Sequence, residues 1–192
     1  MITLLFLITV LNFPGVLVFS SEMDAPVVCL KSGACYRGVY EGAVGDIAVF
    51  RGMKYAATTE GENRWRLPQP RTEVPGEVLD ATVSGPACVQ PGGGTITHGM
   101  SEDCLSADLY VPRSVLEDGG ALAPVFVWVY GGGYSTGQGS FYDGTEFARR
   151  GVVFANFNYR TSSLGFFALE SLPHRNFGLH DQQFFLSWMR TN

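Results

Sequence analysis

The sequence predicts an α/β fold in which two neighbouring strands run parallel and a short helix connects them. Val125 to Tyr130 is apolar at every position, and Gly151 to Arg160 is a second run of the same kind. A strand without apolar–polar alternation is typical of a parallel sheet covered on both faces. Ser140 to Arg150, between the two runs, suits a short helix, and strand, helix, strand is the order of a parallel crossover unit.

Two further segments flank this unit on its N-terminal side, and one follows it. Gly42 to Ala56 contains short strand-like runs separated by glycine, which favour an antiparallel hairpin. Ser101 to Pro112 contains another strand-like segment that stops at a proline. Phe177 to Asn192 has helical spacing, and its apolar stripe is expected to pack on the core: Phe184, Phe185, Trp188 and Met189. Asp181 is expected near the helix start, where a carboxylate interacts favourably with the helix dipole.

Composition narrows the class of protein. The chain has 192 residues, 46% hydrophobic and 16% charged, which fits one globular domain with a sizeable core. Its formal net charge is −5, and no basic stripe is present. Nucleic-acid binding requires clustered lysine and arginine, so a nucleic-acid partner is not expected.

The first twenty residues predict a targeting segment. Met1 to Ser20 carries no charged side chain, and Pro14 and Gly15 interrupt it, which weakens a membrane-span interpretation. Small residues near Ser20 favour a signal peptide over residues 1–20, leaving residues 21–192 as a secreted or extracellular domain. A retained signal anchor, which would attach the protein to a membrane, is the alternative.

Four cysteines, Cys29, Cys35, Cys88 and Cys104, fit an oxidising compartment. No pair has the spacing of a zinc site and the chain has three histidines, so no metal is expected. Four cysteines allow three pairings, of which we favour the local one, Cys29 with Cys35 and Cys88 with Cys104. Free buried thiols are the alternative.

Three glycines, Gly131 to Gly133, directly follow the first apolar strand. Ligands bind at the carboxyl edge of open parallel sheets, and glycine lets a ligand approach bare backbone N–H groups. An oxyanion hole, a phosphate cradle and a plain turn all remain open, although the lysine and serine or threonine of a P-loop do not follow.

Six segments in order resemble one family. Val125 to Tyr134, VFVWVYGGGY, resembles an apolar strand running into H-G-G-G or Y-G-G-G. FRGMKYA resembles F-x-G-I-P-Y-A, and RWRLPQP resembles R-F-x-x-P. SEDCLSADLYVP resembles S-E-D-C-L-x-L-N-V-x-x-P, and NYRTSSLGFFA resembles N-Y-R-x-x-x-x-G-F-L. NFGLHDQQFFLSWMRTN resembles N-x-G-L-x-D-Q-x-x-A-L-x-W-V-x-x-N. From about Gly38 to Asn192 the chain is therefore similar to the type-B carboxylesterase and cholinesterase family of the α/β-hydrolase superfamily.

The resemblance implies the N-terminal part of an α/β-hydrolase fold: a β-hairpin, then a central, mostly parallel sheet with helices. It implies that the backbone N–H groups of Gly132 and Gly133 form an oxyanion hole, while Gly131 shapes the turn. It also implies a Cys88–Cys104 disulfide and two structural ion pairs, Arg64–Glu102 and Arg160–Asp181. Solvated surface pairs are the alternative for those charges.

The resemblance also implies a serine ester hydrolase that acts on a small-molecule ester and needs no cofactor. The G-x-S-x-G elbow of the family does not occur among these residues. The chain is thus expected to supply the oxyanion loop and not the catalytic triad. His98, His174 and His180 are expected to be surface or structural residues, and Ser135 has no partner base nearby in sequence.

The subtype and two other functions are also considered. Residues 89–103, between the paired cysteines, contain no tryptophan, tyrosine or phenylalanine. The family's choline-ester enzymes carry a tryptophan there for the substrate cation, so a general carboxylesterase is favoured. A non-catalytic adhesion or binding domain of the same fold and a truncated product without function are the alternatives.

Overall fold

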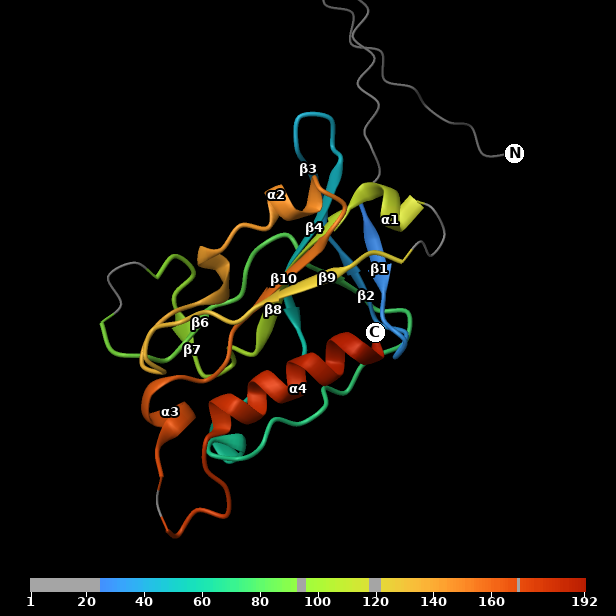
Figure 1. Ribbon diagram of the computed structural model, residues 1–192. Coiled ribbons are helices and arrows are strands. Elements are labelled where there is room, and N and C mark those ends of the chain that lie inside the picture. Colours follow the sequence, from blue (N-terminus) through green and yellow to red (C-terminus); the bar gives the residue numbers. More distant parts are fainter. Residues whose placement is uncertain (1–24, 93–95, 118–121, 169) are drawn as a thin grey trace, which may run out of the picture.

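The computed structural model describes residues 25–92, 96–117, 122–168 and 170–192 (Figure 1). The predicted signal peptide, residues 1–20, lies outside the described residues. The strands are β1 (Val27–Cys29), β2 (Cys35–Arg37), β3 (Val39–Glu41), β4 (Ile47–Lys54), β5 (Val78–Asp80), β6 (Ala87–Cys88), β7 (Met100–Ser101), β8 (Ser106–Pro112), β9 (Val125–Trp128) and β10 (Val153–Phe157). The helices are η1 (Gly61–Asn63), α1 (Arg113–Glu117), η2 (Gly139–Phe141), α2 (Thr145–Ala148), α3 (Ser162–Phe166) and α4 (Phe177–Thr191).

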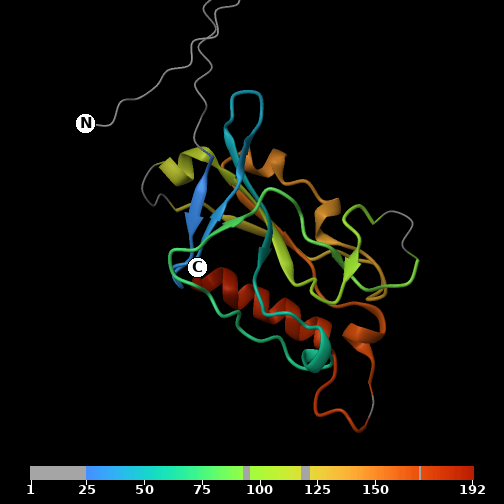
Figure 2. The same cartoon turned by 180° about the vertical axis from the view of Figure 1, so that it is seen from behind.

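A mixed sheet with the strand order β3-β4-β8-β10-β9 forms the centre of the described fold (Figures 1 and 2). β9 and β10 are parallel, whereas the other neighbouring strands of this sheet are antiparallel. An antiparallel hairpin is present, but it begins earlier than predicted: its first strand, β3, ends before Gly42 and pairs with β4, with Val39 opposite Val49. The sheet is therefore less parallel in the described residues than expected: the short turn between β3 and β4 allows only antiparallel pairing, and β4, β8 and β10 also alternate in direction.

The predicted crossover unit is present, and helices cover the two faces of the sheet. α2 lies between β9 and β10 in sequence, and Ala148 of α2 packs in one cluster with Phe154 of β10. The next residues of β10 point the other way: Ala155 and Phe157 pack with Phe185 of α4. Because side chains alternate along a strand, α2 and α4 lie on opposite faces.

The expectation that the first apolar run is covered on both faces is wrong for the described residues. β9 is an edge strand that pairs with β10 alone. Val125 is 52% exposed, Phe126 40% and Val129 45%. Both faces of β9 are apolar, but only β10 lies beside it, so the outer edge stays open to solvent.

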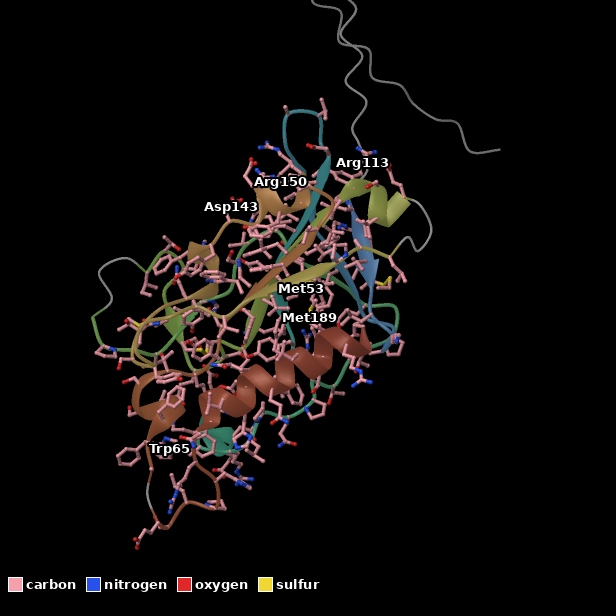
Figure 3. The ribbon with its side chains drawn as sticks, in the orientation of Figure 1. Met53, Trp65, Arg113, Asp143, Arg150 and Met189 are labelled. Atoms are coloured by element: carbon pink, nitrogen blue, oxygen red, sulfur yellow. A yellow bond between two sulfur atoms is a disulfide. The ribbon has the colours of Figure 1, made fainter. Side chains whose placement is uncertain are left out.

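The C-terminal helix α4 packs across the sheet as its apolar stripe predicts. Phe185 is fully buried and stacks on Phe157 with ring centroids 4.1 Å apart. Figure 3 shows Met189 on the side of α4 that faces the sheet. The expected role of Asp181 at the helix start is wrong: α4 begins at Phe177, so Asp181 lies in the second turn, where it pairs with a buried arginine.

A bulge in β4 brings its backbone against the loop that follows β5. The register between β4 and β8 shifts between Phe50 and Met53. Gly52 has φ +70°, and a Cβ there would lie 2.5 Å from the carbonyl oxygen of Val83. Asp108 of β8, which is 3% exposed, accepts the Gly52 N–H at 2.8 Å and the Ser84 hydroxyl at 2.6 Å. This carboxylate therefore holds the bulge and the loop together.

Within residues 25–192, leaving out the undescribed positions, no helix combines the length and the apolar character needed to cross a membrane.

Candidate functional site

Two tyrosines fix the point where the chain passes from β9 into the glycine loop, residues 131–137. Tyr130 and Tyr159 are both 2% exposed, and their rings stack 4.3 Å apart. The Tyr130 hydroxyl donates to the Tyr159 carbonyl at 3.1 Å, and the Tyr159 hydroxyl donates to the Tyr130 carbonyl at 2.5 Å. Burial raises the pKa of Tyr159 to about 12, so this hydroxyl stays a donor at neutral pH. The carboxyl ends of the parallel strands are thus joined directly before Gly131.

The glycine loop makes a tight turn whose main constraint falls on Gly132. The carbonyl oxygen of Gly132 accepts the N–H groups of Ser135 at 3.1 Å and Thr136 at 3.2 Å. Gly132 has φ +134°, and a Cβ there would lie 2.0 Å from the carbonyl oxygen of Thr136. Gly133 has φ +60° with open space at its Cβ position, and Gly131 has neither a positive φ nor a close neighbour. Glycine is therefore required sterically at 132 and conformationally at 133.

Backbone donors at the tip of this loop have no acceptor. No hydrogen bond among the described residues uses the N–H of Gly131, Gly132 or Gly133, and all three residues are exposed. Buried backbone N–H groups are almost always paired, whereas exposed ones can bind water or an anion. Consecutive unpaired N–H groups after a parallel strand can stabilise a negatively charged oxygen. The assignment of Gly132 and Gly133 as oxyanion donors stays a prediction.

The glycine loop ends at Gly137, which is hydrogen-bonded to the side chain of Gln90. Gln90 belongs to the disulfide loop, the segment between Cys88 and Cys104. Gln90 accepts the Gly137 N–H at 2.6 Å and donates to the Gly137 carbonyl at 2.7 Å. Gly137 has φ +128°, and a Cβ there would lie 2.5 Å from the Tyr130 ring. The end of the glycine loop therefore lies directly over the tyrosine at its start.

Both disulfides have the local pairing that the sequence favoured. Cys29 is bonded to Cys35, and Cys88 is bonded to Cys104. Cys88 and Cys104 are almost fully buried and pack in the same core cluster as Tyr130 and Phe185. The second disulfide thus anchors the segment that carries Gln90 to the core beneath the glycine loop.

The two expected ion pairs are formed, in different environments. Arg160 donates from Nε and Nη2 to Asp181 at 2.8 and 2.7 Å, and the two side chains are 4% and 0% exposed. Arg160 also donates to the carbonyl oxygen of Arg66 at 2.9 Å. The Arg64–Glu102 pair lies at the surface, with an Nε–Oε2 distance of 2.6 Å. The hydrogen bond that Arg64 donates to Glu102 raises the pKa of Arg64.

The structure does not assemble a nucleophile and a base. Ser135 is exposed, and its hydroxyl donates to the Gly133 carbonyl at 3.2 Å. The side chains of His98, His174 and His180 make no hydrogen bond within the described part of the chain. His98 lines a surface cavity of about 400 Å³, and His180 lies on α4. Among the described residues, no group of three or more His, Cys, Asp or Glu side chains could hold a metal ion.

Sequence reasoning missed two residues that hold the glycine loop, Tyr159 and Gln90, and one that holds the β4 bulge, Asp108. Tyr159 and Gln90 hold the two ends of the glycine loop through hydrogen bonds that connect distant parts of the chain. Asp108 is a buried carboxylate. Burial raises its pKa, and the hydrogen bonds donated by Ser84 and Gly52 only partly oppose this effect. Only Asp108 had a visible signal, since a charged residue inside an apolar strand needs a partner.

Comparisons with known proteins show which family the chain is similar to. A sequence model described as the carboxylesterase family matches residues 24–192. The chain is 37% identical over 167 residues to a fumonisin B1 esterase of Sphingopyxis macrogoltabida, covering 81% of this chain and 30% of that protein. It is also 37% identical over 164 residues to an acetylcholinesterase of Bungarus fasciatus, covering 77% of this chain and 26% of that protein.

The fold of the chain is also similar to that of solved esterase structures. EstA from Aspergillus niger superimposes with a TM-score of 0.77 at 32% identity, covering 88% of this chain and 32% of that one. A PNB esterase superimposes with a TM-score of 0.75 at 32% identity and 86% coverage of this chain. The chain therefore spans about a third of the length of these relatives.

Proposed function

Because the chain belongs to the carboxylesterase family, we propose that it forms the N-terminal part of a serine carboxylic-ester hydrolase and supplies its oxyanion hole. The observation that supports this most directly is that the backbone N–H groups of Gly132 and Gly133 donate no hydrogen bond within the described residues. They follow the carboxyl end of a parallel strand, where open α/β sheets bind ligands. Each donor of such a hole contributes about 3 kcal/mol of transition-state stabilisation.

The reaction proceeds by acyl transfer. A serine outside the residues printed here attacks the ester carbonyl, and a histidine takes the serine proton and passes it to the leaving alcohol. The serine attack puts negative charge on the carbonyl oxygen before the alcohol leaves, and the N–H groups of Gly132 and Gly133 stabilise this charge. A water molecule, activated by the same histidine, releases the acid from the acyl-enzyme. Arg160 and Asp181 contribute by fixing α4 against the end of β10.

The substrate is a small-molecule ester with an uncharged alcohol group. Residues 89–103 provide no aromatic side chain that could bind a quaternary ammonium group. The fumonisin B1 esterase and the phenmedipham hydrolase of Pseudarthrobacter oxydans, 41% identical over 155 residues, are named for substrates other than choline esters. A general carboxylesterase fits both observations.

The protein acts outside the cell, with residues 1–20 as its signal peptide and residues 21–192 as the start of the esterase domain. The uncharged apolar leader and the two disulfides support this location. N-terminal sequencing of the secreted protein tests it: a mature N-terminus at Ser21 is expected, and an uncleaved Met1 would contradict it.

Hydrolysis of p-nitrophenyl acetate by the protein as its gene encodes it, including any residues beyond those printed here, tests the activity. We expect turnover that a fluorophosphonate abolishes by modifying the serine. Residues 21–192 alone are expected to give no fluorophosphonate-sensitive turnover. If the whole protein is folded but inert and has another residue at the elbow serine, the esterase proposal fails and a binding domain of the same fold takes its place.

A further inference from the structure

Gln90 makes three hydrogen bonds that connect the disulfide loop with the glycine loop. Its Nε2 donates to the carbonyl oxygens of Cys88 at 2.9 Å and Gly137 at 2.7 Å. Its Oε1 accepts the N–H of Gly137 at 2.6 Å. The side chain is almost fully buried, with the residue 8% exposed. One planar amide therefore satisfies both polar groups of Gly137 and is itself tied to the disulfide.

We propose that Gln90 is a positioning residue for the oxyanion hole, an inference that rests on the proposed function. It touches no substrate. By holding Gly137, it keeps the N–H groups of Gly132 and Gly133 directed at the position where the oxyanion forms.

The contact that transmits this effect is between Thr136 and Gly132. The Thr136 carbonyl lies so close to Gly132 that a Cβ there would be 2.0 Å from its oxygen, and the Thr136 N–H donates to the Gly132 carbonyl at 3.2 Å. Thr136 directly precedes Gly137, so a shift of Gly137 moves the Thr136 peptide against Gly132. Packing this close transmits small displacements instead of absorbing them.

Two other sets of hydrogen bonds hold the loop, but neither is made by Gly137, whose other contact is packing against the Tyr130 ring. Tyr130 is fixed at the start by its hydrogen bonds with Tyr159. The Tyr134 carbonyl accepts the N–H of Ser162 at 2.6 Å, which holds the outer side of the loop. At the end, the only hydrogen bonds to Gly137 in the described residues come from Gln90. A misplacement of about 1 Å at a catalytic group can lower a rate about 100-fold, so this anchor matters for the chemistry.

The variant Gln90→Met tests the proposal, because methionine has a similar volume and none of the three hydrogen bonds. Gln90→Glu keeps the acceptor for the Gly137 N–H. Burial beside the Cys88 and Gly137 carbonyl oxygens favours a protonated carboxyl, whose hydroxyl can donate to one of them, so this variant should rescue part of the effect. Gln138→Met is the matched control: Gln138 is 1% exposed and adjacent to Gly137, but its amide contacts Thr97 at 3.3 Å instead of the loop backbone.

The first measurement is hydrogen exchange at the N–H groups of Ser135 and Thr136, which reports on the loop without any need for activity. We expect Gln90→Met to accelerate this exchange at least about tenfold, Gln90→Glu to have a smaller effect and Gln138→Met to have none. Unchanged exchange in a folded Gln90→Met protein overturns the proposal. If Gln90→Met does not fold, the same comparison is made with Gln90→Glu.

The second measurement is steady-state hydrolysis of p-nitrophenyl acetate by the whole protein. We expect Gln90→Met to lower kcat by about 10- to 100-fold with KM nearly unchanged, because the oxyanion exists only in the transition state. Affinity for a trifluoromethyl ketone, which forms an oxyanion on the catalytic serine, should fall by a similar factor. Faster exchange with an unchanged kcat would overturn the positioning role. A wild-type protein without turnover would refute the proposed function, while the exchange result would still show whether Gln90 holds the loop.

Discussion

The guanidinium of Arg160 and the carboxylate of Asp181 are joined by two hydrogen bonds, of 2.8 and 2.7 Å, while both side chains are almost completely buried. Arg160 follows β10 and Asp181 lies in α4, so the pair connects the end of a central strand to the helix that covers it. A buried pair contributes little net stability, but breaking it leaves one charge without a partner in a low-dielectric interior.

Replacing one member of this pair should therefore destabilise the protein more than replacing both. We expect Asp181→Leu or Arg160→Met alone to lower the free energy of unfolding by about 3–5 kcal/mol. The double variant should lose less than either single variant. Urea denaturation followed by circular dichroism measures these differences. Additive losses would show that the ion pair is not the reason for the cost.

A series of alanine substitutions in the glycine loop separates steric from conformational demands. Gly131→Ala should be nearly neutral for stability, because its Cβ would enter open space and its φ is not positive. Gly133→Ala should cost about 1–2 kcal/mol, because alanine disfavours φ +60°. Gly132→Ala should cost more, since its Cβ would collide with the Thr136 backbone.

The same series tests the oxyanion hole in the whole protein. Gly132→Ala should lower kcat for an ester by about 10²–10³-fold, the effect of losing one oxyanion donor. Thermal unfolding and ester hydrolysis together make the measurement. Equal losses of stability for the three variants would contradict the geometry of the loop, and full activity of Gly132→Ala would contradict its catalytic role.

Those parts of the fold that depend on local patterns could be predicted from the sequence. The apolar stripe of α4 and the crossover through α2 follow from side-chain spacing. The hairpin was also predicted, but its first strand lies before the segment in which it was expected. The burial of β9 could not be predicted in this way. An apolar strand is expected in the middle of a sheet, but its actual neighbours depend on the order of strands, which local pattern does not contain.

In the candidate site, too, the features set by local sequence could be predicted, and those set by contacts between distant residues could not. Glycine at 132 and 133 was noticeable because three consecutive glycines exceed what an ordinary turn needs. Gln90 was not noticeable, because it lies 47 residues from its partner Gly137 and a single glutamine carries no pattern. The partner of Asp181 could be predicted from the family's motif, which implies the ion pair with Arg160. The helix-dipole role, inferred from helix-start statistics, was wrong because Asp181 lies in the second turn.

Asp108 gives a prediction for the pH dependence of stability. Burial raises the pKa of Asp108, so the folded protein binds this proton more tightly than the unfolded chain. The resulting stabilisation is present below the unfolded pKa of about 3.9 and is lost as the pH rises through the raised folded pKa. At neutral pH the ionised carboxylate therefore lowers stability, and asparagine, the residue in the family's motif, would not.

We accordingly expect Asp108→Asn to raise the free energy of unfolding at pH 7, with the gain shrinking as the pH falls through the raised folded pKa and levelling off below about 3.9. Urea denaturation across this pH range measures the effect. Asp143→Asn changes an exposed carboxylate and is the control, for which no gain at neutral pH is expected. A destabilised Asp108→Asn protein at pH 7 would show that the hydrogen bonds from Gly52 and Ser84 require the charge.

Removing the Cys88–Cys104 disulfide should destabilise the protein and loosen the glycine loop. The bond closes a loop of sequence separation 16. On the chain-entropy model, a loop of about 15 residues contributes about 3 kcal/mol. The variant with Cys88→Ala and Cys104→Ala should lose this amount in urea denaturation. A matched change of Cys29 and Cys35, whose loop has a sequence separation of 6, should cost less.

The open edge of β9 predicts how residues 21–192 behave as an isolated chain. Val125, Phe126 and Val129 are exposed by 40% or more, and no charged side chain lies within β9. An apolar edge strand without charges offers unpaired backbone groups to another chain. β10 already has neighbours on both sides, so a further parallel strand could pair only with β9. The isolated chain is therefore expected to self-associate through this edge.

Sedimentation velocity at increasing protein concentration tests this expectation. The isolated wild-type chain should form larger species, and Val125→Lys should shift it towards the monomer, because a lysine on an edge strand opposes pairing. Val44→Lys is the matched control, since Val44 is 77% exposed in the turn between β3 and β4, away from that edge. A wild-type chain that stays monomeric would exclude the association. A Val44→Lys variant that dissociates as readily as Val125→Lys would show that the association does not depend on the β9 edge.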